Sequence, residues 1–121
     1  MKKYFSILIL SFVVAVSAGA QVINKVEVTA DPASFTGKCP ATIKFKATIY
    51  SQGSGTITYT WLRSDGGHQR NNLSVSLSGK GVDEVVYTWR LGKNFTGWVA
   101  METVSPNKVK SNSAKFQVTC Q

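Results

Sequence analysis

The feature that most limits the fold of this chain is a two-residue alternation of apolar and polar side chains. In the clearest segment the apolar positions are Ile43, Phe45, Ala47 and Ile49. Because successive side chains of a β-strand point to opposite faces, this spacing predicts a strand with one buried and one solvated face. A helix needs apolar residues three and four positions apart, and no segment after residue 20 sustains that spacing. We therefore expect a nearly all-β domain.

Similar patterns, bounded by Gly, Pro, Asn or Ser, predict six further strands. They lie around Val26 and Val28, from Ile57 to Trp61, from Leu73 to Leu77, from Val85 to Leu91, from Gly97 to Val104 and from Ser113 to Cys120. Seven short strands joined by tight turns match an antiparallel sandwich of two sheets. A small closed barrel is the alternative, because closing a sheet also hides its edges.

The first 20 residues have the layout of a secretory signal peptide. Lys2 and Lys3 precede an apolar run that ends at Val16, and small residues at positions 18 and 20 suit cleavage after Ala20. As a helix this run spans about 20 Å, less than the roughly 30 Å hydrocarbon core, so cleavage is favoured over a retained anchor. We predict a signal peptide over 1–20 and one mature domain over 21–121, secreted to the periplasm or the extracellular medium without a transmembrane anchor.

Export determines how the two cysteines are interpreted. Thiols in an oxidising compartment normally pair, and Cys39 with Cys120 is the only bridge that the chain can form within itself. Closing a loop of about 80 residues stabilises a fold by roughly 4 to 5 kcal/mol in the loop-entropy model. A zinc site is not expected because no histidine accompanies the cysteines, and a redox pair would need a closer spacing.

The chain has few side chains suited to catalysis. His68 is the single histidine, and it lies in a predicted loop without a nucleophile motif. Asp83 and Glu84 are adjacent, so on a strand they point to opposite faces and cannot act as an acid–base pair. The glycines near residues 53 and 79 lack the rest of a nucleotide-binding signature. We expect no enzyme activity, no metal and no cofactor.

The positive charge of the chain suggests a first candidate binding surface. The formal net charge is +8, and it stays strongly positive without Lys2 and Lys3. Alternation places four basic side chains outward: Lys25, Lys44, Lys46 and Arg90. They gather on one face if the first, second and fifth strands share a sheet, and such a face would attract anionic polymers with salt-sensitive affinity. The alternative is that these cations only protect sheet edges and keep the domain soluble.

The aromatic residues suggest a second candidate. Four of them are expected in the core: Tyr59, Trp61, Tyr87 and Trp89. Trp98 differs, because Glu102 shares its parity and a solvated Glu102 places Val99 and Met101 inward and Trp98 outward. An exposed tryptophan is a candidate contact for sugars or proteins. The alternative for Trp98 is half-buried packing at a strand end.

Several segments together resemble the immunoglobulin-like domains of secreted bacterial proteins. They are Cys39–Thr42 with Phe45, Tyr59–Gly66, Trp98, Pro106-Asn107, Ser111-Asn112 and Phe116–Cys120. The resemblance covers most of residues 22–121 and implies a disulfide-closed β-sandwich used as an extracellular module, with no catalytic residues to carry over. The cysteines depart from the antibody pattern, because they would tie strand ends together rather than sheet centres.

These observations predict a secreted, non-catalytic immunoglobulin-like module that binds an extracellular protein or glycan. A structural component of the envelope or matrix is one alternative. A secreted polyanion-binding effector that acts through the basic face is another.

The substitution Cys39→Ser is expected to lower the free energy of unfolding by several kcal/mol, because the unfolded chain regains the freedom that the bridge removes. The measurement is thermal or urea unfolding of the exported protein under non-reducing conditions, with mass spectrometry to verify that the parent is bridged. Equal melting temperatures for a bridged parent and the variant would contradict this expectation.

Overall fold

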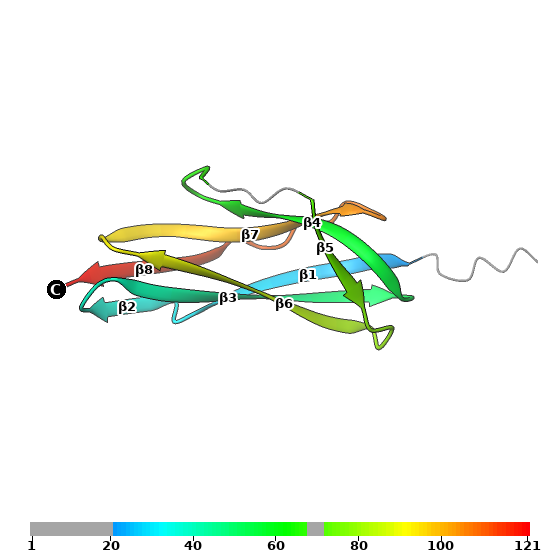
Figure 1. Ribbon diagram of the computed structural model, residues 1–121, viewed down its shortest axis with the longest axis horizontal. Helices are drawn as coiled ribbons and strands as arrows, with labels where there is room; N and C mark the ends of the chain where they lie inside the picture. Colours follow the sequence, from blue (N-terminus) through cyan, green and yellow to red (C-terminus); the bar gives the residue numbers. More distant parts are fainter. Residues whose placement is uncertain (1–20, 68–71) are drawn as a thin grey trace, which may run out of the picture.

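The computed structural model describes residues 21–67 and 72–121 as a two-layer β-sandwich (Figure 1). The strands are β1 (Val22–Asp31), β2 (Ser34–Gly37), β3 (Ala41–Gln52), β4 (Gly55–Arg63), β5 (Leu73–Leu77), β6 (Val82–Leu91), β7 (Phe95–Ser105) and β8 (Ala114–Cys120). One sheet has the order β1-β3-β6, and the other has the order β2-β8-β7-β4-β5. In the described part of the chain no helix is long and apolar enough to cross a membrane. The predicted signal peptide over 1–20 and His68 lie outside the described residues.

All seven predicted strands are present, and they form the open sandwich rather than the closed barrel. The eighth strand, β2, was not predicted because its four residues contain a single large apolar side chain, Phe35. After Pro32 the chain leaves the three-stranded sheet, and β2 pairs in parallel with β8 so that Gly37 lies opposite Cys120. The other strand pairs are antiparallel.

The core lies between the sheets and is rich in aromatic rings. Phe45 of β3 contacts Phe116 of β8 with ring centroids 5.2 Å apart, so the two layers meet directly. Trp89 of β6 packs against Phe116 at 5.3 Å and against Phe95 at 5.1 Å. Of the four predicted core aromatics, Tyr59, Trp61 and Trp89 are buried, and Tyr87 is half-buried against the core.

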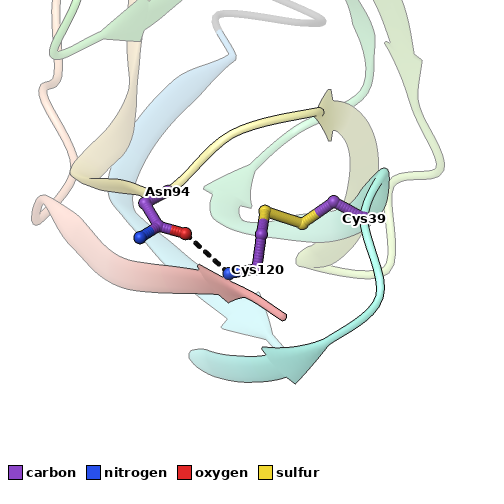
Figure 2. The surroundings of a disulfide bond; sticks show 3 residues. All are labelled: Cys39, Asn94 and Cys120. Carbon is purple, nitrogen blue, oxygen red and sulfur yellow. Dashed lines mark hydrogen bonds between the residues drawn. A yellow bond between two sulfur atoms is a disulfide. The ribbon is translucent and has the colours of Figure 1, made fainter.

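The disulfide is formed between Cys39 and Cys120, with Cα atoms 5.4 Å apart (Figure 2). Cys39 lies in the connection between β2 and β3, and Cys120 ends β8. The bridge therefore ties strand ends together, as the sequence predicted. Asn94, between β6 and β7, adds a third segment, because its Oδ1 accepts a hydrogen bond from the backbone N–H of Cys120 at 2.6 Å.

Two asparagines from the connection between β7 and β8 occupy the free edge of β1. The side-chain amide of Asn107 accepts from the N–H of Ile23 and donates to its carbonyl, both at 2.9 Å. Asn112 makes the same two bonds to Val28, also at 2.9 Å. A side-chain amide offers the same donor and acceptor as a peptide group, so these residues take the place of a neighbouring strand. They protect an edge that would otherwise be open to pairing.

The substitution Asn112→Ala is expected to lower the free energy of unfolding by about 1 to 3 kcal/mol, because it leaves the partly buried N–H and carbonyl of Val28 without partners. The matched control is Asn24→Ala, which truncates an exposed asparagine of β1. Urea unfolding of the two variants measures the difference. Equal losses of stability would show that the Asn112 amide contributes no specific stabilisation.

Candidate functional site

The outer faces of the two sheets differ in chemistry. The outer face of the three-stranded sheet, which we call the charged face, carries all four of the basic residues predicted to point outward. The outer face of the five-stranded sheet, which we call the hydroxyl face, carries mainly threonine and serine together with Trp98. Each face is a continuous surface of neighbouring strands and therefore a candidate for binding.

On the charged face, the basic side chains share the surface with three carboxylates. The basic residues are Lys25 from β1, Lys44 and Lys46 from β3, and Arg90 from β6; the carboxylates are Glu27, Asp31 and Glu84. The Nζ of Lys25 lies 2.6 Å from a carboxylate oxygen of Glu27, and the Nζ of Lys46 lies 3.6 Å from one of Glu84. The face is therefore of mixed sign, with one more basic than acidic side chain. Sequence analysis did not count Glu84 on this face, although Glu84 shares the parity of Arg90.

The Lys25–Glu27 pair stays ionised at neutral pH. The hydrogen bond from Lys25, and then its charge, lower the pKa of Glu27. The same hydrogen bond and charge attraction raise the pKa of Lys25. Each group favours the charged form of the other, so the pair contributes no net charge to the face.

The hydroxyl face has a different composition. Its outward residues on β4 and β5 include Thr56, Thr58, Thr60, Ser74 and Ser76. The hydroxyl oxygens of Thr58 and Ser105 lie 2.9 Å apart in a hydrogen bond. Glu102 of β7 and Lys115 of β8 supply the charges on the outward side of the described strands of this sheet. The face can therefore offer many neutral hydrogen-bonding groups. The alternation of threonines from residue 56 to residue 60 carried this signal in the sequence.

Trp98 is half-buried, as the alternative expected, and along β7 it shares the outward parity of Thr96 and Glu102. Val99, Met101 and Thr103 are fully buried, and Ala100, which lies between them with the opposite parity, is fully buried as well. Trp98 lies next to Lys115 of β8 in the strand register. Leu62 of β4, which is also half-buried, lies opposite Ala100 in the register and supplies a second apolar side chain on this face.

The backbone of Trp98 is fixed by Ser64, which follows β4. The N–H of Ser64 donates to the carbonyl of Trp98, and the N–H of Trp98 donates to Oγ of Ser64, both at 3.1 Å. Gly97 has no room for a side chain, because an added Cβ would meet Ser64 and the ring of Phe95. These contacts hold the tryptophan at a defined position on the sheet.

Arg63 anchors the turn that contains Ser64. Its guanidinium lies 3.6 Å from the centre of the Trp89 ring and donates to the hydroxyl of Tyr87 at 3.2 Å. It also forms a two-bond ion pair with Asp65. Asp65 in turn accepts from the N–H of Gly67 at 2.9 Å, which closes the turn. Sequence analysis did not identify this cluster, although Arg63 shares the inward parity of Trp61.

The chain matches no protein-family profile and no curated protein. Solved structures with a similar fold include two domains of archaeal proteins. The CARDB domain of a Pyrococcus furiosus protein, solved in complex with di-metal ions, aligns with a TM-score of 0.61 and 12% identity over 82% of this chain and 96% of its own. The PKD domain of an M14-like peptidase from a Thermoplasmatales archaeon aligns with a TM-score of 0.55 and 20% identity over 85% of this chain and 98% of its own. The fold is immunoglobulin-like.

The likeness to these immunoglobulin-like domains concerns the fold. Both identities are low, and both proteins are archaeal, so the likeness does not establish a bacterial origin. Within residues 21–67 and 72–121 of this chain, no three His, Cys, Asp or Glu side chains come together as a set of metal ligands.

The substitution Asp65→Asn is expected to lower the melting temperature at pH 7, by an amount that shrinks as the pH falls below about 4. The hydrogen bond from Arg63 lowers the pKa of Asp65 in the folded protein. The stability linked to that shift is therefore present above the unfolded pKa of about 4 and is lost as the pH falls through the folded pKa. Melting curves of both proteins from pH 2 to pH 7 make the comparison. A difference that does not depend on pH would contradict the assignment.

Proposed function

We propose that this chain is a secreted, non-catalytic immunoglobulin-like module that binds an extracellular glycan through the hydroxyl face around Trp98. The observation that carries the proposal is an outward, half-buried tryptophan held in place on a sheet of mostly neutral hydrogen-bonding side chains. An extracellular protein partner is the alternative occupant of the same surface, and the experiment below distinguishes the two.

The chemistry of the hydroxyl face suits a sugar. An indole ring offers a flat apolar surface on which a pyranose ring can stack, and its N–H remains available as a donor. Neighbouring outward residues supply hydroxyl and amide groups, including Thr96 of β7 and Gln117 of β8, which lie opposite each other in the register. Such groups match the hydroxyls of a glycan, and most of them are neutral, so binding would desolvate few charges.

The rigidity of the site also supports binding. The hydrogen bonds of Ser64 fix the backbone of Trp98, and the Arg63 cluster fixes Ser64. A backbone that is ordered before binding loses less conformational entropy when the ligand arrives. The site is thus built on strands and a braced turn, which is the arrangement that favours precise recognition.

Secretion and the absence of catalysis belong to the same proposal. The Cys39–Cys120 disulfide is consistent with an extracellular domain. The sparse set of titratable side chains in the sequence supports a binding role rather than catalysis.

Polyanion binding through the charged face has less support. Glu27, Asp31 and Glu84 lie among the four basic side chains, and two of the cations are paired with them. The field above this face is therefore much weaker than the net charge of the chain suggests. A purely structural role in an envelope or matrix predicts no selective ligand for either face.

The substitution Trp98→Ala is expected to weaken glycan binding about tenfold or more, because the stacking surface is lost. The measurement is binding of the purified protein to a panel of immobilised neutral and acidic glycans, with melting curves to check the fold. Val104→Ala is the matched control, because Val104 is an exposed apolar residue at the far end of the same strand.

Binding to neutral glycans should persist at high salt. Capture of acidic glycans alone, lost uniformly as salt rises, would favour the charged face instead. Salt-resistant capture of one protein, with no glycan bound, would favour a protein partner. No capture of either would favour the structural role.

A further inference from the structure

β6 is a long edge strand, equal in length to β1 at the other edge of the same sheet. It pairs with β3, and no other strand in the described residues lies against its opposite edge. It has ten residues and runs along much of the sandwich (Figure 1). The free edge of β1, the other end of the same sheet, is occupied by Asn107 and Asn112. The edge of β1 is therefore covered by side chains, whereas the edge of β6 has no neighbouring strand in the described residues. A long unpaired edge is a template for pairing with another strand.

The register shows which backbone groups of β6 face this open edge. The N–H of Ser51 donates to the carbonyl of Gly81 at 2.9 Å, which continues the pairing of Tyr50 with Val82. In an antiparallel pair, residues alternate between bonding to the partner strand and pointing away from it. The odd-numbered residues of β6 therefore bond to β3. The N–H and carbonyl groups of the even-numbered residues point to the open edge: Val82, Glu84, Val86, Thr88 and Arg90.

The same edge exposes apolar side chains on both faces of the sheet. On the outer face, Val82 and Val86 are 49% and 48% exposed, among the highest values for large apolar residues in the described chain. On the inner face, Val85 and Tyr87 are only half-buried. A strand laid against this edge would cover all four side chains and satisfy the unpaired backbone groups.

The charged residues of β6 indicate which strand binds at this edge. If two copies of β6 pair antiparallel about a two-fold axis at Tyr87, even-numbered residues of one copy face even-numbered residues of the other. Glu84 then lies opposite Arg90 of the second copy, and Val86 lies opposite Thr88 of the second copy. Two-fold symmetry makes each of these pairs occur twice. Opposite charges in directly facing positions favour one register over its neighbours.

We propose that the free edge of β6 binds β6 of a second copy of this chain, joining the two three-stranded sheets into one continuous sheet. The edge is complementary to itself in backbone groups, in apolar side chains and in charge. The hydroxyl face belongs to the other sheet, so this pairing leaves the proposed glycan site open. Dimerisation and glycan binding can therefore succeed or fail independently.

The first test is the oligomeric state of the purified protein, measured by sedimentation from micromolar to hundreds of micromolar concentrations. A concentration-dependent dimer is expected. A monomer throughout this range would overturn the proposal.

The second test is a charge swap across the interface. Glu84→Arg and Arg90→Glu are each expected to weaken the dimer about tenfold, because each places like charges opposite one another at two symmetric positions. The double variant restores opposite charges and should regain the parental affinity. Lys44→Glu is the matched control: it changes the net charge as much as Arg90→Glu but lies on the central strand. Equal weakening by the control, or no rescue in the double variant, would overturn the register.

The third test removes one backbone donor. Thr88→Pro deletes an N–H that points to the open edge, a position at which a strand tolerates proline, and it should abolish the dimer. Circular dichroism and a melting curve check that the monomer still folds. If it does not fold, the charge swap decides the question, since those variants alter only exposed side chains. A dimer unaffected by a folded Thr88→Pro variant would place the interface elsewhere.

Discussion

The structure depends on the aromatic contacts that join the two sheets, such as the contact between Phe45 and Phe116. Each ring lies on a strand whose neighbours alternate between the core and solvent, so the contact fixes which face of each sheet is buried. Once the residues of the inner faces are determined, strand alternation also determines which residues lie on the outer faces. The lysines of β3 must face solvent on one side, and Trp98 and the threonines of β4 must face solvent on the other.

The alternation of side chains was therefore enough to predict the sandwich fold and seven of its eight strands. It was also enough to place Lys25, Lys44, Lys46 and Arg90 on one face, once β1, β3 and β6 were assumed to share a sheet. To predict that this face carries both positive and negative charges, every charged residue with the same parity had to be counted, including Glu84 and Asp31. The strand β2 could not be predicted, because its pairing with β8 depends on a crossing between sheets rather than on its own four residues.

Side-chain hydrogen bonds to the backbone were beyond the reach of the sequence. Asn107 and Asn112 lie in a polar connection and meet β1 only because the fold brings residues 84 positions apart together. In the sequence, Arg63 is similarly an ordinary charged residue at the end of a strand. Only the fold shows that its guanidinium packs on the ring of Trp89. Such contacts join segments that are distant in the chain, and local patterns carry no information about them. They nevertheless determine which edges are closed and how firmly Trp98 is held.

The position of the disulfide determines how this domain responds to mechanical load. The bridge closes a covalent loop from Cys39 to Cys120, which contains β3 to β7 and nearly all of β8. Tension applied between β1 and Gln121 passes through β1 and β2 and then crosses directly through the sulfur atoms. The loop itself carries no tension while the bridge is intact. Pulling can thus detach β1 and β2, but it cannot extend the segment that holds Trp98 and most of the core unless the bridge is first reduced.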